Sequence, residues 1–235
     1  MPTPDRPLPV LLVLHQDTSS PGRVGAALTR RGHVLDIRRP RYGEPLPATL
    51  AHHAGAVIFG GPMSANDDDD WIRREIDWIG VALAEEKPFL GICLGAQMMV
   101  RHLGGRVAAH PHGEVEVGWY GLEPTRDGRD LMTWPSHVYH WHREGFEVPV
   151  GARLLATGER FVNQAIVVGR RAYGLQFHPE MTPAIMNRWT VRGAGRLESP
   201  GAEPRHRHFE GQCLHGDRNR LWLERFLDGW LADRR

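Results

Sequence analysis

One of the two cysteines in this 235-residue sequence lies in surroundings that favour nucleophilic chemistry. Cys93 follows the apolar run 88–92 and precedes a helical pattern, with glycines two residues away on either side, at Gly91 and Gly95. This G-x-C-x-G pattern is the thiol counterpart of G-x-S-x-G, a tight strand-to-helix turn that has no room for side chains at those positions. A helix start also favours the thiolate. A lone cysteine is more often a small buried hydrophobe, as we interpret Cys213, but the pattern around Cys93 predicts a nucleophile.

A thiolate nucleophile needs a proton-transfer partner, and the segment 174–180 offers one. The apolar run 172–177 predicts a strand that ends directly before His178, and Glu180 follows two residues later. A carboxylate at this spacing can hydrogen-bond the imidazole and select the tautomer that a base requires. A histidine before a proline is more often structural in a chain with 14 histidines. The strand end and the carboxylate nevertheless favour His178 as the base.

Acyl chemistry at a thiolate also needs hydrogen-bond donors for the oxyanion. The backbone N–H of Leu94, at the start of the predicted helix, is one candidate. The loop 60–64 follows another apolar run, 56–59, and its glycines allow the backbone to approach a ligand. On its own this loop would be an ordinary turn. Its place at the carboxyl end of a predicted neighbouring strand, where ligands of open α/β sheets bind, favours a second donor there.

These residues belong to a repeating pattern of strands and helices that fills the first hundred residues. Short apolar runs predict strands, and apolar residues at helical spacing predict the helices between them. The predicted strands are 9–14, 33–37, 56–59 and 88–92, and the predicted helices are 21–31, 70–86 and 94–103. Alternation at this pace predicts an α/β fold with a flavodoxin-like, mostly parallel central sheet and helices on both faces.

The second half of the chain has a different pattern, with short strands separated by tight turns. The predicted strands there are 114–122, 154–157, 161–168 and 172–177. They indicate an antiparallel extension of the same sheet, followed by a helix over 182–190, a loop over 193–204 and a docked amphipathic helix over 214–231. We expect one domain over 1–235, with 1–8 as a disordered lead.

Composition and charge exclude several classes of protein. A formal net charge of +1 gives no general attraction to nucleic acid or to an anionic membrane. Two cysteines cannot form a disulfide framework, and no apolar run is long enough to span a bilayer. The first residues also lack the pattern of a secretory signal. We therefore expect a cytoplasmic protein that binds neither nucleic acid nor membranes.

Three motifs, taken in order and spacing, resemble those of class I glutamine amidotransferases: FGGPMS at 59–64, GICLGAQ at 91–97 and QFHPE at 176–180. The resemblance is greatest to stand-alone proteins related to the glutamine-hydrolysing domain of GMP synthase, and it extends from the first strand to about Pro183. It implies a triad in which Cys93 is the nucleophile, His178 the base and then acid, and Glu180 the orienting carboxylate. It also implies oxyanion N–H groups from Gly61 and Leu94.

The same resemblance implies where a glutamine-like substrate binds. Gln97 would hold its α-amino or carboxylate end, with Gly60 also at the substrate. The segment Trp141, His142 and Arg143 lies where the family contacts the substrate carboxylate, although its residues are bulkier than the family's small residue and Gly-Asp pair. The resemblance implies no metal or organic cofactor. Because the sequence has no phosphate-binding loop motif, we expect a separate ammonia-accepting synthetase subunit.

Two other functions remain open at this point. One is a stand-alone γ-glutamyl peptidase that uses the same triad on larger leaving groups, and the other is a catalytically silent binding module on this fold. No metal site is predicted, because no histidine shows a compact zinc spacing with cysteine; the candidates considered are His110, His112, His137, His140 and His142. The acidic run 67–70 is interpreted as a solvated helix start, and RHRH at 205–208 is too short to indicate nucleic-acid binding.

Overall fold

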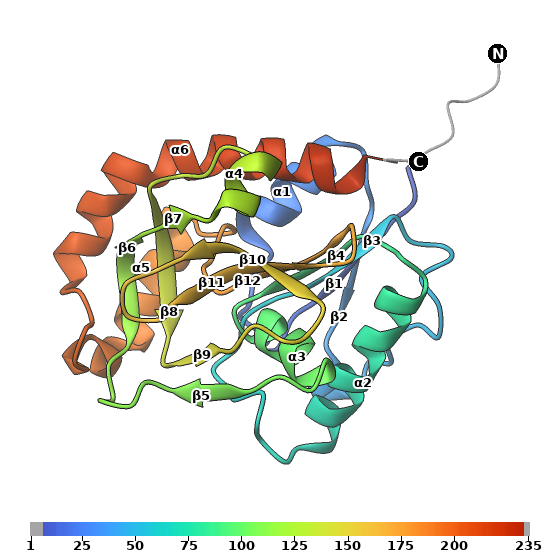
Figure 1. Cartoon of the computed structure of the whole chain (residues 1–235), viewed down its shortest axis with the longest axis horizontal. Coiled ribbons are helices and arrows are strands. Elements are labelled where there is room, and N and C mark those ends of the chain that lie inside the picture. Colours follow the sequence, from blue (N-terminus) through green and yellow to red (C-terminus); the bar gives the residue numbers. More distant parts are fainter. Residues whose placement is uncertain (1–6, 233–235) are drawn as a thin grey trace.

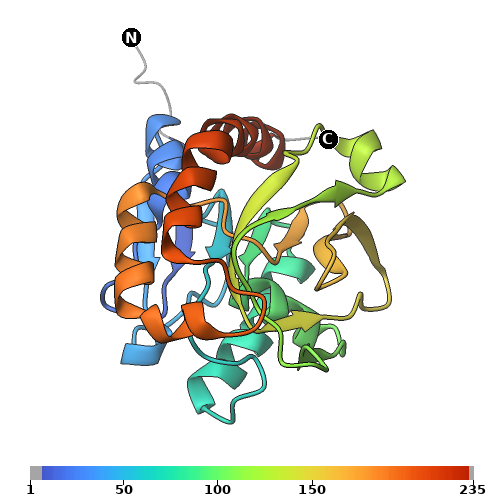
Figure 2. The same ribbon diagram turned by 90° about the vertical axis from the view of Figure 1, so that its left-hand side faces the viewer.

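The computed structural model describes residues 7–232 and places an eight-stranded sheet at its centre, with helices against both faces (Figure 1 and Figure 2). The order of strands is β2-β1-β3-β4-β12-β11-β10-β7. The first five are parallel: β2 (Leu35–Arg38), β1 (Val10–Val13), β3 (Gly55–Ile58), β4 (Phe89–Ile92) and β12 (Ala172–Leu175). The last three continue the sheet in antiparallel fashion: β11 (Asn163–Val168), β10 (Ala152–Thr157) and β7 (Glu123–Pro124). The predicted fold class is therefore confirmed.

The two faces of the sheet are covered by different helices because successive side chains of a strand point to opposite sides. Along β1, Val10 and Leu12 pack in one buried cluster with α1 (Gly22–Arg30) and α6 (Arg205–Leu231). Leu11 and Val13 pack in the other cluster with α2 (Asp70–Ala84) and α3 (Leu94–His102). The strand is thus buried on both sides, which explains its continuous run of aliphatic residues.

The strand predicted over 114–122 does not join the central sheet. It forms β6 (Glu116–Gly121), which pairs only with β8 (His137–His142), a strand that the sequence analysis did not identify. Aromatic side chains of this ladder pack against α5 (Pro183–Arg192), which confirms the helix predicted over 182–190. The remaining elements are the pair β5 (Val107–Ala109) and β9 (Glu144–Phe146), the short helix α4 (Arg126–Leu131) and the 3-10 turns η1 (Pro40–Tyr42) and η2 (Ala194–Glu198).

Two predicted boundaries near the C-terminus differ from the structure. The segment predicted as a loop over 193–204 contains η2, and α6 begins at Arg205 rather than at Leu214. The first turns of α6 escaped detection because they pack through small and polar residues instead of aliphatic ones. A Cβ atom at Gly211 would lie 2.3 Å from the Trp119 ring, and the indole N–H of Trp119 donates to the His208 carbonyl at 2.9 Å.

Both ends of the described chain lie near the same end of the molecule (Figure 1). Six of the residues predicted to be a disordered lead, 1–6, fall outside the described part. At its start, the Leu8 carbonyl lies 2.7 Å from Nδ1 of His33. Among the described residues, no helix combines the length and apolar character needed to cross a membrane.

Candidate active site

Cys93 occupies a strained turn between β4 and α3. Its backbone angles, φ +51° and ψ −103°, lie where residues with a side chain are rarely found. The neighbouring glycines permit the turn: a Cβ atom at Gly91 would lie 2.5 Å from the Gly95 carbonyl oxygen, and one at Gly95 would lie 2.2 Å from that of Ile58. The turn is held from the next strand, since the Cys93 N–H donates to the Leu175 carbonyl at 2.7 Å. The sulfur is therefore presented at the carboxyl end of β4 by local sterics.

His178 reaches the same edge of the sheet from the second half of the chain. β12 ends at Leu175, and the His178 N–H then donates to the carbonyl of Tyr139 in β8 at 2.8 Å. Nδ1 of His178 lies 2.8 Å from Oε1 of Glu180, whereas its Nε2 is buried and has no hydrogen-bond partner among the described residues. Burial acts to lower the pKa of His178, but attraction to Glu180 and to Cys93 raises that pKa to about 10. The imidazole is accordingly charged at neutral pH.

Cys93 and His178 come together at Gly60, in the loop after β3. A Cβ atom on Gly60 would lie 2.8 Å from Cε1 of His178 and 3.4 Å from Cβ of Cys93, so both side chains contact the same stretch of backbone. Both residues line one open cavity of about 280 Å³. The structure thus joins the two halves of the predicted site, and Glu180 lies behind His178 as the sequence predicts.

The predicted oxyanion residues, Gly61 and Leu94, are neighbours in the structure. A Cβ atom at Gly61 would lie 3.0 Å from Cδ2 of Leu94, and Gly61 lines the cavity. The sequence analysis missed the residue that supports this loop: His15, directly after β1, lies 3.1 Å from the Gly60 carbonyl oxygen and 2.9 Å from Oε1 of Glu75, with both side chains fully buried. Burial opposes the charge on His15, yet Glu75 raises its pKa. The sequence offered one signal for this role, which is that His15 is a polar residue directly after the strand predicted over 9–14.

The predicted substrate-binding residues separate into two groups. Trp141 lines the cavity, as does Gly60. His142 follows Trp141 in β8 and therefore faces the opposite way, into the interior, where its Nδ1 lies 3.0 Å from the Glu144 carbonyl. Gln97 is also buried and donates to that carbonyl at 2.8 Å, so neither residue contacts the cavity. Arg143 is exposed and lies outside the cavity lining.

Two parts of the cavity can now be distinguished. We call Gly60, Gly61 and Cys93, together with Leu94, the floor; Leu94 does not itself line the cavity but packs against Gly61. The wall is a group of aromatic and cationic residues from β8, α5 and η2, namely Trp141, Arg188, Trp189, Arg192 and Arg196. In the wall, the Trp189 ring meets the His178 ring edge-to-face at 4.8 Å. The sequence analysis assigned no function to the three arginines, although two of them lie four residues apart in a helix that directly follows the QFHPE motif.

A buried polar cluster lies elsewhere in the interior. Nε2 of His142 is 3.0 Å from Oε2 of Glu116 and 3.0 Å from Nδ1 of His140, and Gln164 donates to the same carboxylate oxygen at 2.8 Å. The donor set of Glu116, His140 and His142 is close enough to hold a metal ion. Because the hydrogen bonds join β6, β8 and β11, and none of these residues lines the cavity, we assign the cluster a structural role.

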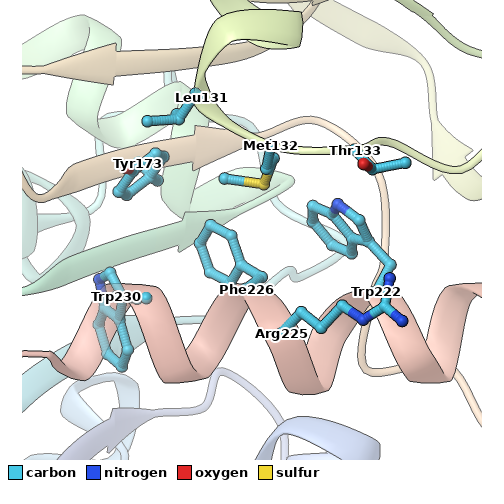
Figure 3. Close-up of a pocket in the computed structure, with 9 residues that line it drawn as sticks. Leu131, Met132, Thr133, Tyr173, Trp222, Arg225, Phe226 and Trp230 are labelled. Carbon is cyan, nitrogen blue, oxygen red and sulfur yellow. The ribbon is translucent and has the colours of Figure 1, made fainter.

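A second cavity, of about 130 Å³, is formed by α6 and the segment after α4 (Figure 3). Its walls are mainly aromatic and apolar, with Tyr173, Trp222, Phe226 and Trp230 among them, and Arg225 is the one charged lining residue. None of its lining residues is a cysteine, histidine, aspartate or glutamate. This cavity thus has no thiol, imidazole or carboxylate, whereas the cavity above Cys93 is lined by both a thiol and an imidazole and is the candidate active site.

Comparison with known proteins places this chain in a family. Residues 26–191 match the family model "Glutamine amidotransferase class-I". The chain is 31% identical over 183 residues to the glutamine amidotransferase-like protein YfeJ of Salmonella typhimurium, an alignment that covers 74% of this chain and 76% of YfeJ. It is also 31% identical to the glutamine-hydrolyzing GMP synthase of Aeropyrum pernix, over 77% of this chain but only 36% of that protein.

The fold agrees with that of a glutamine amidotransferase of known structure. The crystal structure of a glutamine amidotransferase from Methylobacillus flagellatus superposes with a TM-score of 0.88, at 27% sequence identity, and covers 96% of this chain and 94% of that one. The segment matched by the family model, 26–191, includes Cys93, His178 and Glu180. The chain belongs to the class I glutamine amidotransferase family.

Proposed function

We propose that the protein hydrolyses the γ-glutamyl amide bond of glutamine and related compounds, with Cys93 as nucleophile. The observation that carries this proposal is the convergence of two distant segments: Cys93 in its strained turn and His178 in its ion pair contact the same glycine and line one cavity. Membership of the amidotransferase family supports the same chemistry. Glutamine is the default substrate, and no cofactor is needed for the steps below.

The reaction starts from a thiolate on Cys93 and an imidazolium on His178. The sulfur attacks the γ-carbonyl carbon, and the resulting oxyanion accepts hydrogen bonds from the N–H groups of Gly61 and Leu94. The C–N bond then breaks as His178 gives its proton to the leaving nitrogen, which departs as ammonia and leaves a γ-glutamyl thioester. The neutral His178 takes a proton from water as hydroxide attacks the thioester; the C–S bond breaks and glutamate is released. Glu180 keeps Nε2 of His178 available through its bond to Nδ1.

We further propose that the ammonia is used by a separate synthetase subunit. The proposal is supported by the similarity to a glutamine-hydrolyzing GMP synthase, only 36% of whose length this chain covers. A relative of this kind uses the nitrogen that it releases, so a matching acceptor enzyme would raise turnover of glutamine when added to this protein. The nature of the acceptor is left to that measurement.

The decisive experiment compares the two cysteines. Cys93→Ala is expected to lower the rate of glutamine hydrolysis by at least about 10³-fold, because no other thiol lines the cavity. Cys213→Ala is the matched control, since Cys213 is exposed on α6, and it should hydrolyse glutamine at the normal rate. Mass spectrometry should also place the label of diazo-oxo-norleucine, a γ-glutamyl electrophile, on Cys93. An intact protein that neither turns over nor becomes labelled, alone or with extracts, would be a silent binding module.

A further inference from the structure

The wall of the cavity carries more positive charge than a glutamine substrate can neutralise. Arg188, Arg192 and Arg196 all line the cavity, and no aspartate or glutamate is among the lining residues. Glutamine has one α-carboxylate and one α-ammonium group, so its net charge is zero. Arg188 and Arg196 are half-buried, where a cation is normally matched by an anion because desolvation without a partner is costly, and Arg192 adds an exposed positive charge. The positive charge of the wall therefore favours a substrate that has another anionic group besides the α-carboxylate of its glutamyl part.

Two of these arginines have no partner among the described residues. Among residues 7–232, neither Arg192 nor Arg196 forms a salt bridge or a side-chain hydrogen bond, whereas Arg188 donates to the Thr18 carbonyl. Arg196 is partly buried, and its pKa is lowered by this burial and by repulsion from Arg143. An arginine of this kind is available for a planar anion, which it can bind through two parallel hydrogen bonds.

The position of the wall relative to His178 indicates which part of a substrate it contacts. In the proposed reaction, His178 protonates the leaving nitrogen, so the leaving group must lie beside the imidazole. The ring of Trp189 packs edge-to-face on that imidazole at 4.8 Å. Arg188 is the adjacent residue of α5, and Arg192 lies one helical turn further on. The wall is thus beside the imidazole that delivers the proton, which is the side of the leaving group.

We propose that the wall is a binding subsite for an anionic amine leaving group, so that the preferred substrates are γ-glutamyl amino acids or peptides whose amine portion carries a carboxylate. Arg192 and Arg196 bind that carboxylate, and the indole rings of Trp141 and Trp189, 5.7 Å apart, contact its hydrocarbon part. The inference rests on the proposed function, because it takes the nucleophile and the acid from there. The leaving group of such substrates is the amine of an amino acid or peptide, and the ammonia proposed for a synthetase comes only from the slower turnover of glutamine.

The test uses two substrates of nearly equal size that differ in one charge, γ-glutamylglycine and γ-glutamylglycinamide, with glutamine as a third. The intact protein is expected to cleave γ-glutamylglycine with a kcat/KM about tenfold above that of the amide, the usual value of one charge-assisted hydrogen bond. In Arg192→Gln and Arg196→Gln this ratio should fall toward one. Arg192→Lys should retain most of the preference, and Arg101→Gln, a change of an exposed arginine on α3, should leave the ratio unaltered.

The outcomes separate this inference from the function on which it rests. Equal cleavage of the two substrates by the intact protein would overturn the anion subsite and leave the γ-glutamyl hydrolase intact. Arginine variants that lose activity equally on all three substrates, glutamine included, would also overturn it, because these arginines would then bind the common glutamyl part. If none of the substrates is cleaved in a Cys93-dependent manner, the proposed function itself is wrong.

Discussion

The floor and the wall of the cavity differ in how tightly their atoms are fixed. In the floor, Cys93 is only 5% exposed, and the glycines beside it leave no space for even one additional carbon atom. In the wall, Trp189 and Arg196 are partly exposed, and Arg192 is fully on the surface. The floor is built from β4, α3 and the loop after β3, where strands and helices pack backbone to backbone. The wall is built from side chains that project from α5 and η2.

This difference indicates that the floor determines the reaction and that the wall selects the substrate. A strained cysteine keeps its conformation only where the surrounding structure leaves no alternative, and the floor provides that rigidity. Long aromatic and cationic side chains at a helix surface can be exchanged at little cost in folding free energy. Substitutions in the floor should therefore affect folding and turnover, and those in the wall should affect substrate preference.

The largest effect is expected from Gly95→Ala. Alanine would ordinarily stabilise a helix relative to glycine by about 1 kcal/mol, but its Cβ atom would lie 2.2 Å from the backbone oxygen of Ile58, which cannot move alone. We expect a loss of about 3 kcal/mol or more in the free energy of unfolding, measured with urea. Gly121→Ala is the control, because a Cβ atom there meets nothing within 4 Å. Equal stability of the two variants would show that the turn is not held by close packing.

A smaller effect, on chemistry alone, is expected from Glu180→Gln. The carboxylate is the main attraction that offsets burial and raises the pKa of His178 to about 10, so its loss should lower that pKa toward the ordinary value near 6.5. His178 would then lose its proton at a lower pH and would also lose the hydrogen bond that orients its ring, and the two effects together should lower kcat near neutrality about 10²-fold. NMR titration of His178 and steady-state kinetics measure the two quantities. The control is Glu210→Gln, a change of an exposed residue on α6. If Glu180→Gln left both the pKa of His178 and the turnover unchanged, Glu180 would not belong to the triad.

The floor could be predicted from the sequence because its determinants are local. The apolar strand, the cysteine and the two glycines all occur within 88–95, and steric arguments connect them directly to a strained turn. His178 and Glu180 were found for a similar reason, since two residues suffice to predict an imidazole–carboxylate pair. What the sequence could not show is the pairing of His15 with Glu75, because those residues are 60 positions apart and only the fold brings them together.

Trp141 is the residue of the wall that the sequence predicts at the substrate, whereas the arginines of the wall escaped prediction because they look ordinary in the sequence. Arg188 belongs to the helix predicted over 182–190, Arg192 lies just beyond it and Arg196 lies in the segment predicted as a loop, and charged residues at such places usually have no role beyond contact with solvent. Only the turn of η2, and the ladder of β6 with β8, bring that surface over Cys93. The same ladder explains why His142 and Trp141, adjacent in sequence, end on opposite sides, a distinction that depends on the strand that the analysis did not identify.

The smallest effect is expected from a change in the wall, Trp189→Leu. The indole of Trp189 makes an edge-to-face contact with His178 and offers an apolar surface to the substrate, and the loss of both in the leucine variant should raise KM about tenfold. Since Trp189 is only partly buried, the free energy of unfolding should change by less than in Gly95→Ala. Trp189→Phe keeps a ring beside His178 and should recover most of the affinity, because a smaller ring can still present an edge to the imidazole.

A Leu variant that unfolds as readily as Gly95→Ala would contradict the distinction drawn between the two parts, since the wall would then be as essential to folding as the floor. A rise in KM with kcat and stability preserved would instead identify Trp189 as a residue that positions substrate.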